Sequence, residues 1–151
     1  MEVILTDGFG IKLTEAGMRL YLKKSKLNGF LYVWDEEGDA YETCTRMDEG
    51  EEYEYGEPNW YYVTSSDLGK RAPREEVEDN LLLDADNLSN TDTILIEVLN
   101  EIGCKADRRG CLSIATIPDD IEWYIDGDSE YFCEWIVEGP RPRKWYGKPL
   151  E

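Results

Sequence analysis

The chain has 151 residues, enough for one domain, and its 34 acidic against 16 basic side chains give a formal net charge of −18. A surface this acidic argues against direct binding of nucleic acid or of anionic membranes, because phosphate groups are bound by Lys and Arg. The sequence has no His, which excludes a Ser-His-Asp or Cys-His catalytic centre, and no apolar run of the ~20 residues that a membrane span needs.

The N-terminal part predicts a β-hairpin and then a helix. Residues 1–13 alternate apolar and polar side chains on either side of an Asp7-Gly8 turn signal, which is typical of a hairpin. Thr14 is a favourable N-cap, and cationic side chains gather towards the far end of the following segment, where they suit the helix dipole. Because Asn28-Gly29 is a stop signal, we expect a helix over about residues 14–27.

The middle of the chain predicts strands separated by acidic turns. Apolar and aromatic runs indicate strands at residues 30–34, 40–45 and 59–64. Residues from about 48 to 90 are acidic and mostly irregular in pattern, and within them residues 81–83 fit either a short helix or a strand. We therefore expect an acidic, irregular middle section in an otherwise regular domain.

The C-terminal part predicts a second helix and three more strands. Asp92 is a favourable N-cap, and the apolar side chains after it share one helical face to about residue 102. Strand patterns follow at residues 111–117, 121–125 and 131–137, with a hairpin turn at Asp126 to Ser129 and a basic tail at residues 140–151. The layout predicts a single α+β domain over residues 1–151, with a largely antiparallel sheet and two main helices, about 14–27 and 92–102.

The cysteines and the first residues bear on the compartment. None of Cys44, Cys104, Cys111 and Cys133 forms a CxxC pair, and a zinc site without His would need all four scattered thiolates. The first ten residues are charged and strand-like, unlike the apolar core of a signal peptide. We expect reduced thiols, no cofactor and a cytoplasmic location.

Three sets of carboxylates deserve a test as metal or catalytic groups. Asp84-x-Asp86 and Asp126-x-Asp128-x-Glu130 begin like calcium loops, but neither has the required Gly and the correctly spaced Glu. Asp119-Asp120 with Glu122 is a candidate hydrolytic set, and a turn after Pro118 explains the same residues. We predict no catalytic residues and no metal site, with a carboxylate-metal enzyme kept as an alternative.

Acidic side chains concentrate in two runs. Residues 35–57 contain eleven acids and one base, and residues 75–101 contain nine acids and no base. Together they are expected to form a negative face, on which Tyr side chains would serve as anchors for a protein partner. The predicted partner-binding residues are Asp35, Glu36, Glu37, Asp39, Asp48, Glu49, Glu51, Glu52, Tyr53, Glu54, Tyr55 and Glu57.

The second half of the chain resembles a known pattern. Residues 92–106 resemble a "D-x-x-L-I-E-V-V-E-E-L-G-x-K-A" helix, residues 114–123 an "I-x-x-I-P-D-D-V-E-W" segment and residues 134–138 an "E-W-I-x-E" strand, and residues 5–14 resemble the same family's start. The family consists of small bacteriophage and prophage proteins, mostly of Gram-positive hosts, and the closing "E-x-H-R-x-W" of its pattern is replaced here by a sequence without His. The resemblance implies a phage context and carries no activity.

Charge, missing catalytic groups and the phage context together give one leading hypothesis. We expect a phage accessory protein in the cytoplasm of an infected bacterium. It would mimic nucleic acid and inhibit a basic host protein, either a nucleic-acid-binding protein or a defence enzyme such as a CRISPR effector or restriction enzyme. The alternatives are a homo-oligomeric assembly protein, for which a homodimer is the simplest form, and the carboxylate-metal enzyme.

Overall fold

The computed structural model describes residues 1–6, 10–34, 42–51, 60–83, 88–108, 112–128 and 133–139. These residues form antiparallel sheets and helices, and the two longest helices fall where the sequence places them, so the predicted α+β class is confirmed. No helix among these residues has the length and apolar character needed to cross a membrane.

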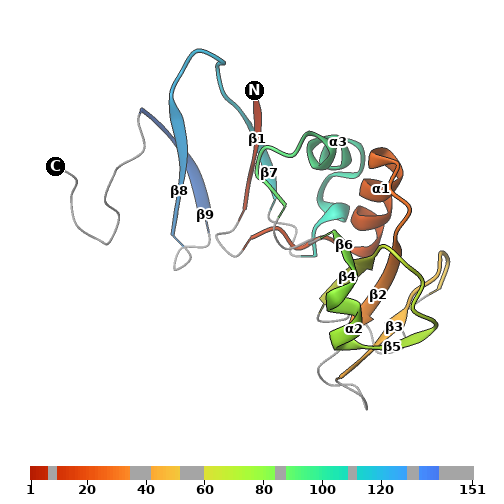
Figure 1. The fold of residues 1–151 in the computed structure, drawn as a ribbon. Coiled ribbons are helices and arrows are strands. Elements are labelled where there is room, and N and C mark those ends of the chain that lie inside the picture. The colour runs from red at the N-terminus through yellow and green to blue at the C-terminus, as the bar shows by residue number, and fades with distance from the viewer. Residues whose placement is uncertain are drawn as a thin grey trace.

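The largest sheet has five antiparallel strands in the order β5-β3-β2-β4-β6 (Figure 1). The strands are β5 (Arg71–Pro73), β3 (Thr43–Arg46), β2 (Phe30–Trp34), β4 (Trp60–Thr64) and β6 (Leu81–Leu83). The central strand β2 is apolar on both sides, as a strand covered on both faces must be. The sheet therefore separates two distinct hydrophobic clusters.

The first cluster lies between the sheet and the helices α1 (Glu15–Ser25) and α3 (Thr93–Ile102). Leu31 and Val33 of β2 point into it, and Met18 and Leu95 of the helices are fully buried there. Both helices begin at the predicted caps. The Thr14 hydroxyl accepts from the Gly17 N–H, and the Asp92 carboxylate accepts from two N–H groups of the first turn of α3.

The second, smaller cluster lies on the opposite face of the sheet, under α2 (Arg74–Asp79). It is built from Tyr32, Cys44, Tyr62, Ala72 and Val77. The sequence between residues 65 and 83 shows little periodicity, yet β5, α2 and β6 follow one another there with almost no connecting residues.

Close approach of the backbone fixes α1 against the 3-10 turn η2 (Gly103–Ala106) that follows α3. A Cβ atom added to Gly17 would lie 2.6 Å from the Ala106 carbonyl oxygen, so a side chain cannot be accommodated without movement. The N–H of Thr14 donates to the same oxygen at 2.9 Å. α1 ends at Ser25 rather than near residue 27, because Lys26 takes the left-handed conformation at φ 59°.

The predicted hairpin of residues 1–13 is wrong in its pairing. β1 (Glu2–Leu5) pairs with β7 (Ser113–Thr116), more than a hundred residues away. Ile11 and Leu13 instead bury their side chains in the first cluster, and Leu13 makes an isolated bridge to Asp107. Burial of both segments among other elements outweighs the local turn signal.

The last two strands, β8 (Trp123–Asp128) and β9 (Cys133–Glu138), form a separate two-stranded ribbon beside β1 and away from α2 (Figure 1). The predicted turn at Asp126 to Ser129 begins too early, because β8 continues to Asp128, which pairs with Cys133. The side chains of residues 123–127 and 134–138 are all partly or fully exposed.

Candidate functional site

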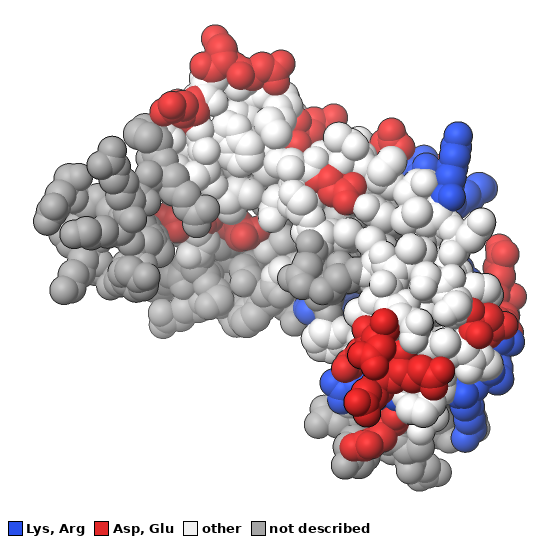
Figure 2. All heavy atoms as spheres, viewed as in Figure 1, with Lys and Arg blue, Asp and Glu red and all other residues white. Residues whose placement is uncertain are grey.

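The acidic residues of α2 form a compact cluster at the surface. The helix has six residues, and Val77 alone is fully buried, which leaves Glu75, Glu76, Glu78 and Asp79 exposed. Figure 2 shows acidic side chains gathered over this part of the molecule. Glu75 and Glu76 are favourable in the first turn, whereas Asp79 at the negative end of the helix dipole is not. The Asp79 carboxylate therefore does not stabilise the helix through its dipole.

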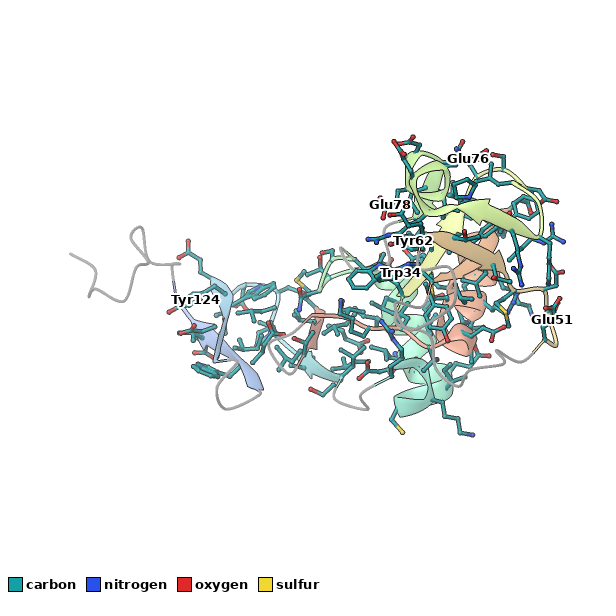
Figure 3. The ribbon with its side chains drawn as sticks, turned by 90° about the horizontal axis from the view of Figure 1, so that it is seen from below. Trp34, Glu51, Tyr62, Glu76, Glu78 and Tyr124 are labelled. Atoms are coloured by element: carbon teal, nitrogen blue, oxygen red, sulfur yellow. The ribbon has the colours of Figure 1, made fainter. Side chains whose placement is uncertain are left out.

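One side of α2 is held by a chain of polar and aromatic contacts. The Arg74 guanidinium carbon lies 4.0 Å from the centre of the Trp34 ring, within cation–π range. Arg74 Nε donates to Glu78 Oε1 at 2.9 Å, and the Tyr62 hydroxyl donates to the same oxygen at 3.2 Å. In Figure 3, Glu78, Tyr62 and Trp34 lie together beside α2. These contacts position Glu78 and neutralise part of its charge.

An open depression of about 270 Å³ adjoins these contacts. Its lining comes from Glu42, Pro73, Arg74, Glu75 and Glu78. The backbone fixes its shape, because the Arg74 N–H donates to the Glu42 carbonyl at 2.7 Å and thereby ties the start of α2 to β3. With three carboxylates and one guanidinium around it, the depression suits a cationic side chain better than an apolar or anionic ligand.

The groups beneath α2 are unsuited to acid–base or nucleophilic work. Burial raises the pKa of the Cys44 thiol to about 12, so the thiol stays protonated at neutral pH. Burial also raises the pKa of Tyr62, and the nearby Glu78 carboxylate acts in the same direction. Cys44 packs in the second cluster, and Tyr62 packs there and donates a hydrogen bond to Glu78.

Two of the predicted partner-binding residues, Asp48 and Glu51, are engaged in ion pairs at the end of β3. Arg46 contacts Asp48 at 2.9 Å and Asp67 at 2.7 Å, and Lys70 contacts Glu51 at 2.7 Å. The hydrogen bond from Arg46 is the largest cause that lowers the pKa of Asp48, because it favours the charged form of the carboxylate. Glu51 lies apart from the α2 cluster in Figure 3.

The other predicted partner-binding residues divide into two groups. Glu49 is exposed in a turn after β3. The remainder lie outside the described residues, namely Asp35, Glu36, Glu37, Asp39, Glu52, Tyr53, Glu54, Tyr55 and Glu57. Their role in partner binding stays a prediction.

The acidic run 75–101 is divided by the fold. Its first part forms α2 and its last part lies on α3, and the two helices cover opposite faces of the five-stranded sheet. Asp92 and Glu101 are further occupied by the Tyr21 hydroxyl at 2.6 Å and by Lys24 at 3.2 Å. The α2 residues thus form a cluster of their own, which the predicted site did not include. The cluster could have been found from residues 74–79, in which four acidic residues surround a single apolar one.

Two of the candidate metal or hydrolytic carboxylates, Asp119 and Asp126, accept hydrogen bonds within the chain. Asp119 accepts from the amino group of Met1 at 2.9 Å, and Asp126 accepts from the Gly127 N–H at 2.8 Å. Within the part of the chain that the structure describes, no three Cys, Asp or Glu side chains come together as metal ligands. Asp84, Asp86 and Glu130 lie outside that part.

Comparison of the chain with protein families, with curated proteins and with solved structures finds no match in any of the three.

Proposed function

We propose that this protein is a non-catalytic inhibitor that binds the basic surface of a host nucleic-acid-handling or defence protein through the acidic face of α2. The observation that carries the proposal is the cluster Glu75, Glu76, Glu78 and Asp79, exposed on one short helix beside a polar depression. The chain's net charge of −18 supports it, because a strongly negative protein is attracted to basic surfaces at long range.

The charge density of α2 is comparable to that of a nucleic acid. Glu75 and Asp79 are four residues apart, so the four carboxylates occupy about 6 Å of helix axis. Duplex DNA carries one phosphate charge per about 1.7 Å of axis when both strands are counted. A cationic cleft that accepts a phosphate backbone therefore meets a similar number of negative charges over the same length.

The ion pairs at the end of β3 make α2 the more attractive surface for a partner. Asp48, Asp67 and Glu51 already have Arg46 or Lys70 as counter-ions, whereas on α2 only Glu78 has a described basic contact, with Arg74. A partner that docks on α2 supplies counter-charges that the described part of the chain does not provide to Glu75, Glu76 and Asp79.

The test is affinity capture from a bacterial lysate, in low and in high salt, with the protein and a triple variant, Glu75→Gln, Glu76→Gln and Asp79→Asn. We expect the protein to capture a basic nucleic-acid-handling partner, with an association rate that falls steeply as salt rises. The triple variant should associate about tenfold or more slowly at low salt.

A matched control is Glu97→Gln, which removes an exposed carboxylate from α3 on the other side of the sheet. It should leave capture unchanged. Capture that is insensitive to salt, or that the triple variant retains in full, contradicts the proposal. An assay of the captured protein's activity on nucleic acid then distinguishes inhibition from binding without inhibition.

A further inference from the structure

A second surface, distinct from α2, is the ribbon of β8 and β9. Among the described residues each of these strands pairs only with the other. A two-stranded ribbon is marginally stable by itself, and this one has apolar side chains on both faces. Trp135 is 42% exposed, and the other apolar side chains at residues 123–125 and 136–137 are only partly buried. Figure 3 shows the ribbon, with Tyr124 labelled, far from Glu76 and Glu78.

The outer edge of the ribbon is the side of β8 away from β9, and no described strand pairs with it. The Gly139 N–H donates to the Glu122 carbonyl at 2.7 Å, so residues 122, 124 and 126 direct their backbone groups at β9. The backbone groups of Trp123 and Ile125 consequently point away from β9. The inner strand β9 faces β1, where the Thr6 N–H donates to the Glu134 carboxylate at 2.6 Å.

The two faces of β8 differ in a way that specifies a complementary strand. On one face stand Trp123 and Ile125, which are apolar. On the other face Tyr124 lies between Glu122 and Asp126. A strand added along β8 would therefore be favoured if its side chains alternated, apolar beside Trp123 and Ile125 and cationic beside the two carboxylates.

Charge argues for a basic strand from another protein rather than for the same ribbon of a second copy of the chain. Residues 112–139 contain eight acids and no base. Two such ribbons placed edge to edge would set like charges against one another, which is destabilising. A basic strand has the opposite effect.

We propose that the outer edge of β8 binds an extended segment of a partner protein, in which apolar residues alternate with Lys or Arg, as a third strand of the ribbon. Backbone hydrogen bonds to Trp123 and Ile125 supply affinity, and the two faces supply specificity. This surface is independent of α2, and its test does not depend on the proposed inhibitory function.

The probe is a seven-residue peptide that alternates Val and Lys, compared with one that alternates Val and Glu. Ile125→Pro removes the outward N–H and leaves the β8–β9 hydrogen bonds of residues 124 and 126 in place, because Pro is tolerated where an edge N–H faces solvent. Ile125→Val keeps the N–H and is the matched control. Calorimetry measures affinity, and amide hydrogen exchange at Tyr124 and Val137 shows whether the ribbon remains formed.

We expect the Val–Lys peptide to bind the protein, about tenfold more weakly to Ile125→Pro, and with little change to Ile125→Val. The Val–Glu peptide should not bind. The triple α2 variant should bind the Val–Lys peptide as the unaltered protein does. Absence of binding, equal binding to Ile125→Pro with the ribbon intact, loss of binding in the α2 variant, or dimerisation that Ile125→Pro abolishes would each overturn the proposal.

Discussion

The two faces of the five-stranded sheet are covered in different ways. On one face, α1 and α3 bury long aliphatic side chains, and Met18, Leu95 and Val98 are fully excluded from solvent. On the other face, the short helix α2 inserts Val77 alone, and the neighbouring Tyr32 and Tyr62 keep their hydroxyls in hydrogen bonds with polar groups at the rim. Arg46, directly opposite Tyr32 in the sheet, places its charge on this second face too.

The two faces therefore differ in how much they contribute to stability and to surface charge. Hydrophobic stabilisation scales with apolar area removed from water, so most of it comes from the α1–α3 face. The α2 face contributes less stability and presents charge. Substitutions on the two faces should therefore have unequal effects on folding, and the following experiments measure that inequality.

The largest loss of stability is expected from Leu95→Ala on the α1–α3 face. Leu95 is fully buried, and truncation removes apolar contacts and leaves a cavity. The free energy of unfolding, measured by urea denaturation, should fall by about 3 kcal/mol. Leu27→Ala, at a 40% exposed side chain, is the control and should change stability little. Equal effects of the two substitutions would contradict the assigned core.

A smaller loss is expected from Val77→Ala on the α2 face. Val77 is the single buried residue of α2 and lies in the smaller cluster. Truncation of Val77 to Ala also removes less side-chain volume than truncation of Leu95 to Ala. Unfolding should become easier by about 1 to 2 kcal/mol. Glu75→Ala, an exposed position in the same helix, provides the comparison. If Val77→Ala destabilised the protein more than Leu95→Ala, the contrast between the two faces would be wrong.

A gain in stability is expected from a substitution at the C-terminal end of α1. Lys26 is the only described non-glycine residue with positive φ, a conformation that carries steric strain for an L-side chain. Lys26→Gly should raise the free energy of unfolding by about 0.5 to 1 kcal/mol. Lys23→Gly, inside the same helix, should have the opposite sign because glycine disfavours helix interiors. Destabilisation by Lys26→Gly would show that the Lys side chain itself stabilises this end.

The smallest effect concerns the ion pairs of Arg46, which are partly exposed to solvent. Arg46 helps to hold the pKa of Asp48 below its ordinary 3.8, and that of Asp67 is lowered first by the Gly69 N–H and then by Arg46. A carboxylate with a lowered folded-state pKa stabilises the fold above its ordinary pKa, and this stabilisation is lost as the pH falls through that value towards the lower one.

Urea denaturation at neutral pH and at about pH 3 tests this linkage. Arg46→Gln should destabilise the protein more at neutral pH than in acid. Arg71→Gln, at an exposed position in β5, is the control and should show no such pH dependence. The same stability difference for Arg46→Gln at both pH values would show that its effect does not come from Asp48 and Asp67.

Local signals predicted some elements well. Thr14 and Asp92 marked the two main helices because each cap forms within its own segment. The apolar and aromatic run at residues 30–34 likewise predicted the strand β2, of which Leu31 and Val33 enter one cluster and Tyr32 the other.

Elements that depend on distant residues were harder to predict. The pairing of β1 with β7 is set by burial between remote segments, which no turn signal encodes. The helix α2 has one buried residue, so it lacks the apolar periodicity from which helices are predicted. The predicted site emphasised the acid-rich run before β4, whereas Glu51 meets Lys70 only once β3 and β5 pair.

The short passage from β5 into α2 has a consequence for recognition. Pro73 closes the strand and Arg74 opens the helix, and the Arg74 N–H is already bonded to Glu42 on the neighbouring segment. No hinge separates the sheet from the carboxylates, so their backbone positions are settled before any encounter. An approaching molecule would lose little entropy in ordering this surface, and mismatched shapes could not be accommodated by bending it.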